Sequence, residues 1–124
     1  MSCILVIDDD PDIRGLLLTY FTEQGHQVFV AEDGAHGIGI AAQRRPDVVV
    51  LDVDMPVLDG HSTLHVLKRD PKMAGIPVVV LTSHDNTQTR ERLQRAGCAG
   101  FLGKPFDLKD LHQEIAKNLQ ANPV

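Results

Sequence analysis

Short runs of apolar residues alternate with helix-like segments along the whole chain, and this alternation limits the possible folds more than any other feature. The runs are rich in β-branched residues and rarely alternate with polar positions: CILVI (3–7), QVFVA (27–31), DVVVL (47–51), PVVVL (77–81) and GFL (100–102). Such runs are typical of strands in a sheet that is buried on both faces. We therefore predict a central sheet of five strands.

The segments between these runs have the spacing of amphipathic helices, which we expect over residues 11–24, 34–44, 60–70, 86–96 and 107–120. Asp10 and Pro11 fit the start of the first helix, because Asp caps unpaired backbone amides and Pro fits the first turn. The second helix contains Gly34, Gly37 and Gly39. An interior glycine costs a helix about 1 kcal/mol relative to alanine, so we expect this helix to be the least stable.

Five strand–helix units in series predict a doubly wound α/β fold, with a parallel sheet, helices on both faces and right-handed crossovers. The 124 residues suit one domain, which we assign to residues 1–120, with 121–124 as a C-terminal tail. Ligands of such sheets bind at the carboxyl ends of the strands, where the strand order reverses. We therefore expect the functional site at the carboxyl ends of the strands.

The composition argues against several classes of protein. Seventeen acidic and twelve basic residues give a net charge of −5, and no run is rich in Lys or Arg, so we expect no nucleic-acid-binding surface. No apolar run reaches the length of a membrane span, and MSCILVIDDD lacks the features of a signal peptide. Cys3 and Cys98 lack CxxC spacing, which indicates reduced thiols in a cytoplasmic protein.

Carboxylates, hydroxyls and one lysine stand at the expected carboxyl ends of four strands. They are Asp8, Asp9 and Asp10 after the first strand, Asp52 and Asp54 after the third, Thr82 and Ser83 after the fourth, and Lys104 after the fifth. If the first and third strands are neighbours, Asp8, Asp9 and Asp52 converge. Two carboxylates about 4 Å apart repel by about 4 kcal/mol at an effective dielectric near 20, so this cluster requires a cation or bound protons.

Oxygen ligands without convergent His or Cys favour Mg²⁺, which keeps several waters and pairs well with phosphate. Lys104 supplies a point charge and Thr82 a hydroxyl, and together they suit an oxyanion. The sequence therefore predicts a Mg²⁺ pocket beside a site for a phosphate-like group.

Ordinary structural roles explain several other residues. Asp10 fits a helix cap, Asp59–Gly60 a turn or cap, and Thr82 could also cap the fourth helix. The strand-end carboxylates could simply be solvated, although carboxylates clustered at a cleft more often mark function. His61 and His65 have a spacing that could share a metal, but no third ligand is evident, and a solvated helix face is the better interpretation.

Taken together, ILVIDDDPDIR, DVVVLDVDMPVLDG, PVVVLTS and AGCAGFLGKPF resemble the receiver domain of bacterial-type response regulators, the phosphorylated half of two-component signalling. The resemblance covers essentially the whole chain and implies a flavodoxin-like (βα)5 fold. In length the chain is similar to single-domain, chemotaxis-type regulators.

The resemblance implies that Asp52 is the phosphoacceptor and that Mg²⁺ is the cofactor. Asp9 would bind the metal directly, Asp8 directly or through water, and Asp52 and the backbone carbonyl of Asp54 would complete the protein ligands. The reaction would be attack by a carboxylate on phosphorus, giving an aspartyl phosphate. The donor would be a phosphohistidine on a histidine kinase or phosphotransfer protein, which a small acyl phosphate could replace.

The resemblance also implies a switch. Thr82 and Lys104 would hold the phosphoryl oxygens in the active state, and Phe101 falls at the aromatic switch position. Movement of Thr82 would let Phe101 turn inward and change the surface formed by the fourth helix, fifth strand and fifth helix. An output protein would read that surface.

Some residues depart from the usual pattern of this family. Phe101 lacks the hydroxyl that many relatives carry as Tyr, and Asp54 and His84 border the expected phosphoryl group. We therefore expect an unusual phosphoryl lifetime, in a direction that the sequence leaves open. Arg14, Gly15 and Leu18 suggest a docking face on the first helix, with a core position for Leu18 as the alternative.

Three other interpretations compete with a phosphorylated stand-alone receiver. LDVDMP also resembles the opening motif of haloacid-dehalogenase-type phosphatases, but two acids precede it and only about seventy residues follow. A receiver-like binding module that no longer accepts phosphate is the second alternative, although every residue that the family needs is present. The third is a receiver excised from a longer regulator or hybrid kinase.

Overall fold

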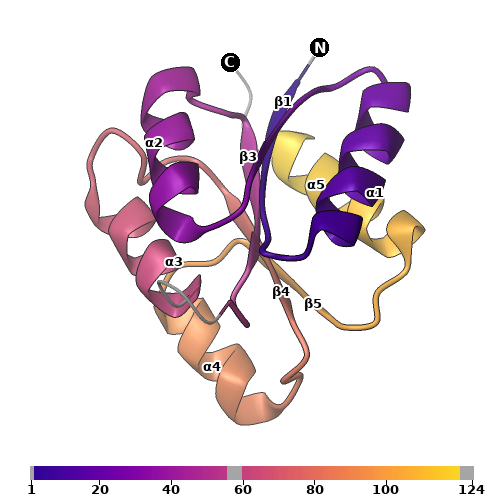
Figure 1. Cartoon of the computed structure of the whole chain (residues 1–124). Helices are drawn as coiled ribbons and strands as arrows, with labels where there is room; N and C mark the ends of the chain where they lie inside the picture. Colours follow the sequence, from indigo (N-terminus) through magenta and orange to yellow (C-terminus); the bar gives the residue numbers. More distant parts are fainter. Residues whose placement is uncertain (1, 56–59, 121–124) are drawn as a thin grey trace.

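The computed structural model describes residues 2–55 and 60–120, with the side chain of Gln120 left out. Strands and helices alternate strictly along it (Figure 1): β1 (Cys3–Ile7), α1 (Pro11–Glu23), β2 (Gln27–Ala31), α2 (Gly34–Arg44), β3 (Val48–Asp52), α3 (Gly60–Arg69), β4 (Val78–Thr82), α4 (Thr87–Arg95), β5 (Gly100–Gly103) and α5 (Leu108–Gln120). The predicted five strand–helix units are confirmed.

The five strands form one parallel sheet in the order β2-β1-β3-β4-β5. Helices α1 and α5 cover one face, and α2, α3 and α4 cover the other (Figure 1). The chain leaves β1 toward β2 on one side and returns to β3 on the other, so the strand order reverses between β1 and β3. This reversal brings the loops that follow β1 and β3 together at one edge of the sheet.

Burial on both faces explains why the strands lack polar alternation. Val48 to Asp52 and Val78 to Thr82 are buried at every position. Successive residues point to opposite faces, so Val49 and Val80 join the core under α2, α3 and α4, whereas Val50 and Val79 join the core under α1 and α5. Each strand therefore supplies apolar side chains to two cores at once.

The predicted element boundaries agree with the structure to within about one residue. The third and fourth strands each run one residue further than predicted, so Asp52 and Thr82 are the last residues of β3 and β4. Asp10 caps α1, as predicted, by accepting a hydrogen bond from the amide of Asp12. The expected tail 121–124 and Asp59 lie outside the described residues.

One predicted alternative is wrong: Thr82 does not cap α4. The N-cap is Asn86, whose side chain accepts a hydrogen bond from the amide of Thr89 (2.8 Å). Thr82 instead ends a buried strand four residues earlier, which leaves its hydroxyl available to the edge of the sheet. Of the helices in the described part of the chain, none has the length and apolar character needed to cross a bilayer.

The glycines of α2 differ in the space around them. Gly37 is buried against Ile7, and a Cβ at this position would overlap that side chain, whereas a Cβ at Gly39 would meet nothing within 4 Å. Helix propensity alone predicts the same effect of alanine at both positions. Any difference in stability between the two substitutions must therefore come from packing.

We predict that Gly39→Ala raises the free energy of unfolding by about 0.5–1 kcal/mol, because alanine loses less backbone entropy on folding. Gly37→Ala should lower it by about 1–3 kcal/mol, because the added methyl overpacks a buried strand. Urea unfolding followed by circular dichroism measures both. Equal stabilisation by the two substitutions would contradict the close packing of α2 on β1.

Candidate functional site

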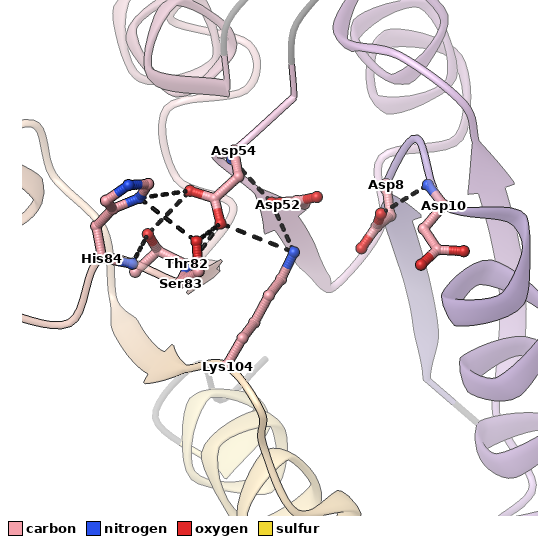
Figure 2. Close-up of polar contacts among 8 residues, drawn as sticks. All are labelled: Asp8, Asp10, Asp52, Asp54, Thr82, Ser83, His84 and Lys104. Atoms are coloured by element: carbon pink, nitrogen blue, oxygen red, sulfur yellow. Dashed lines mark hydrogen bonds and ion pairs between the residues drawn. The ribbon is translucent and has the colours of Figure 1, made fainter.

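Four loops meet at the carboxyl edge of the sheet and bring the predicted polar residues together (Figure 2). Asp8 directly follows β1, Asp52 and Thr82 end β3 and β4, and Lys104 directly follows β5. Asp8, Asp52 and Thr82 are buried, at 1%, 2% and 1% exposure. Such burial is unusual for carboxylates unless they are paired or bind a metal.

Asp8, Asp9 and Asp52 form an acidic cluster. Each offers one carboxylate oxygen, and these oxygens all lie within 4.8 Å of one another. Burial, together with the charge of Asp52, raises the pKa of Asp8 to about 7 even though the amide of Asp10 donates a hydrogen bond to its Oδ1. Within the described residues, Oδ2 of Asp8 is buried without a partner. An orphaned oxygen among converging carboxylates fits a hard divalent cation such as Mg²⁺.

Lys104 points toward Asp52 and Asp54 (Figure 2). Its Nζ is 3.1 Å from Oδ1 of Asp52 and 3.9 Å from Oδ2 of Asp54. Burial alone would lower the pKa of Lys104, but the hydrogen bond to Asp52 and the nearby carboxylates outweigh it and raise the pKa. The Lys104–Pro105 peptide bond is cis. Lys104 is therefore a firmly charged group directed at Asp52.

The side chain of Asp54 turns away from the acidic cluster and toward the β4–α4 loop (Figure 2). It accepts hydrogen bonds from the amide and hydroxyl of Ser83 (2.7 and 2.8 Å) and from the hydroxyl of Thr82 (3.1 Å), and lies 3.3 Å from Nδ1 of His84. Burial would raise the pKa of Asp54, but the hydrogen bonds from Ser83 outweigh it and lower the pKa. The sequence predicted a metal-binding backbone carbonyl at Asp54 and a side chain that borders the phosphoryl group, but it did not predict these bonds to the β4–α4 loop.

Thr82 and Phe101 stand apart from the acidic cluster. The Thr82 hydroxyl donates to Asp54 rather than to Asp52, and accepts a hydrogen bond from the amide of His84 (3.0 Å). Phe101 pairs with Val80 in the sheet, whereas Thr82 pairs with Gly103, two residues further along β5. Phe101 is partly buried. Arg90 from α4 stacks on that ring, with its guanidinium carbon 4.8 Å from the ring centroid.

Within the described part of the chain, the structure does not support a metal site at His61 and His65. Among the described residues, the acidic cluster is the one group with metal-ligand geometry, so no such group includes His61 or His65. His65 is exposed and contacts Arg69 (3.1 Å).

On α1, Arg14 donates to the carbonyl of Asp8 (2.9 Å), so it supports the β1–α1 loop. Leu18 is 38% exposed and is not a core residue.

Comparison with known proteins agrees with this geometry. The family model described as "Response regulator receiver domain" matches residues 4–116. Protein PilH of Pseudomonas aeruginosa is 36% identical over 115 residues, which cover 93% of this chain and 95% of PilH. The regulator RpaA of Synechocystis, named as a DNA-binding transcriptional regulator, is 37% identical over 111 residues, 90% of this chain but only 46% of RpaA.

Solved structures give the same result. The receiver domain of the Francisella response regulator 1452 superposes with a TM-score of 0.91 at 30% identity and 98% coverage of both chains. The chemotaxis protein CheY4 of Vibrio cholerae superposes with a TM-score of 0.89 at 26% identity, over 94% of this chain and 98% of CheY4. The chain belongs to the response regulator receiver family, the phosphoryl-accepting domains of two-component signalling.

Proposed function

We propose that Asp52 accepts a phosphoryl group from a phosphohistidine donor and that Asp8, Asp9 and Lys104 make this reaction possible. The observation that carries the proposal is the position of Asp52, a buried carboxylate that belongs to the acidic cluster and lies 3.1 Å from Lys104 Nζ. A carboxylate attacking phosphorus needs positive charge around both itself and the donor.

Asp8, Asp9, Asp52 and the backbone carbonyl of Asp54 would hold Mg²⁺. When bound, Mg²⁺ would supply the positive charge that neutralises the nucleophile and the incoming phosphoryl oxygens. Asp8 and Asp9 follow β1 and Asp52 ends β3, so residues from two neighbouring strands would hold the ion. The unpartnered Oδ2 of Asp8 supports this assignment.

Lys104 would stabilise the oxygens that gain charge during transfer, since its ammonium already lies against the attacking carboxylate. Thr82 would act later. Its hydroxyl is bonded to Asp54 and would have to turn toward Asp52 to reach a phosphoryl oxygen. That turn would shift the β4–α4 loop and alter the packing of Phe101 against α4, so the α4–β5–α5 surface would report the phosphorylation state.

The chain would act on its own Asp52 rather than turn over a separate substrate, and its output would be binding to a target protein. The acidic composition gives no support for nucleic-acid binding within this chain. Two free thiols, Cys3 and Cys98, are consistent with a reducing, cytoplasmic location. The proposed receiver unit is residues 1–120, with 121–124 as a tail.

The metal assignment predicts that removing a carboxylate from the acidic cluster stabilises the fold without Mg²⁺ but abolishes stabilisation by Mg²⁺. Without Mg²⁺, Asp8→Asn should raise the free energy of unfolding by about 1–2 kcal/mol, because it removes one of several repelling carboxylates. The asparagine oxygen can still accept the hydrogen bond from the amide of Asp10. Adding Mg²⁺ should stabilise the wild type and leave Asp8→Asn nearly unchanged.

Urea unfolding with and without Mg²⁺ measures both effects. Glu23→Gln removes an equal charge from the opposite end of α1 and serves as the control. The metal assignment is wrong if Mg²⁺ stabilises Asp8→Asn as much as the wild type.

The acceptor assignment predicts a change in mass. Incubation with acetyl phosphate and Mg²⁺ should add one phosphoryl group to the wild type, and none to Asp52→Asn or to wild type treated with EDTA. Lys104→Gln should slow the addition by about tenfold or more, because it removes the charge beside the nucleophile. Intact-mass spectrometry over time measures both.

Other outcomes would support the alternatives. No addition to the wild type, even with a range of acyl phosphates, would favour a phosphorylation-independent binding module. Labelling that persists in Asp52→Asn would place the acceptor elsewhere. Steady release of phosphate from unrelated phosphoesters would favour the haloacid-dehalogenase-type phosphatase.

A further inference from the structure

Phe101 has no hydroxyl with which to bond to its surroundings, yet a polar group lies against its ring. The guanidinium of Arg90 stacks on the ring, with its central carbon 4.8 Å from the ring centroid. A cation over an aromatic face is attracted by the negative charge of that face. Arg90 therefore makes a contact with Phe101 that does not require a hydroxyl.

Asp85 holds Arg90 in this position. Nε of Arg90 lies 2.8 Å from Oδ1 of Asp85, and Nη2 lies 3.3 Å from Oδ2, so both carboxylate oxygens face the planar guanidinium. Two contacts fix the orientation of a guanidinium, whereas a single contact does not. Gly103 makes room for the carboxylate against β5, because a Cβ at Gly103 would lie 2.7 Å from Oδ2 of Asp85.

Asp85 lies in the β4–α4 loop, which directly follows Thr82. Thr82 at the end of β4 and the loop residues Ser83 and His84 all contact the Asp54 carboxylate. Asp85 follows directly and binds Arg90. A single short loop thus has one attachment beside Asp52 and another at the ring of Phe101.

We propose that Arg90 is a positioning residue that couples Phe101 to the β4–α4 loop, and that it favours the arrangement in which Thr82 is bonded to Asp54. The inference rests on the proposed function, because it assumes that Thr82 turns to a phosphoryl group on Asp52. When Thr82 leaves Asp54, the loop moves, Asp85 no longer holds the guanidinium over the ring, and Phe101 is free to repack.

The expected effect is moderate. The side chains of Arg90 and Asp85 are 56% and 40% exposed, and water weakens such contacts. An exposed cation–π contact corresponds to a population shift of about two- to fivefold. Removing Arg90 should therefore make the active arrangement easier to reach by about this factor, without changing the chemistry at Asp52.

The test uses the phosphoryl mimic beryllofluoride with Mg²⁺, and NMR titration of the intact chain to measure its apparent affinity. Arg90→Ala should bind beryllofluoride about two- to fivefold more tightly than the wild type. Asp85→Ala should change the affinity in the same direction. Arg90→Lys should change it by a smaller amount, because lysine keeps the positive charge although it lacks the planar fork. Arg95→Ala is the matched control: Arg95 is on the same helix but pairs with Glu91.

A double-mutant cycle separates coupling through Phe101 from a general effect of charge. In a Phe101→Leu background, Arg90→Ala should no longer change the affinity. Unchanged or weaker binding by Arg90→Ala, or an equal effect in the Phe101→Leu background, would overturn the inference and leave the proposed function standing. Failure of the wild type to bind beryllofluoride at Asp52 would overturn both.

Discussion

The repulsion between buried carboxylates is the constraint on which the rest of the site depends. Asp8 and Asp52 are almost fully buried, and Asp9 adds a third charge within 4.8 Å. Lys104 compensates part of this charge from one side, 3.1 Å from Asp52. The remaining negative charge is best compensated by a divalent cation, and an arrangement that attracts a cation beside a carboxylate also favours attack by that carboxylate on a phosphoryl group.

The parallel sheet makes this costly arrangement possible. Strands β1 and β3 are neighbours, so the residues that follow them meet at one edge, and the apolar side chains of both strands are buried in two cores. Rigid, buried strands prevent the carboxylates from moving apart. The flanking β4–α4 and β5–α5 loops add Thr82 and Lys104, and the first of these loops also contacts α4 through Asp85. A change at Asp52 therefore has a short physical route to the surface of α4.

Most of the fold was predictable from the sequence, because apolar periodicity and the Asp10 cap are local signals. The convergence of Asp8, Asp9 and Asp52 followed from one topological rule about strand ends. Two features were not predictable from local signals. The bonds from Asp54 to Ser83 and His84 join residues about thirty positions apart, and the stacking of Arg90 on Phe101 depends on how α4 packs on β5. The assignment of Thr82 as a possible cap failed because α4 begins at Thr87 and Asn86 is its N-cap.

A crystal structure of the chain with Mg²⁺ and beryllofluoride would show whether Asp52 accepts the phosphoryl group beside a metal held by Asp8 and Asp9. We expect beryllium bonded to Asp52, with Mg²⁺ held by the carboxylates of Asp8 and Asp9 and by the carbonyl of Asp54. We also expect Lys104 to contact a fluoride and the Thr82 hydroxyl to have moved from Asp54 to the mimic. Beryllofluoride bound at another residue, or Mg²⁺ bound away from Asp8 and Asp9, would contradict this assignment.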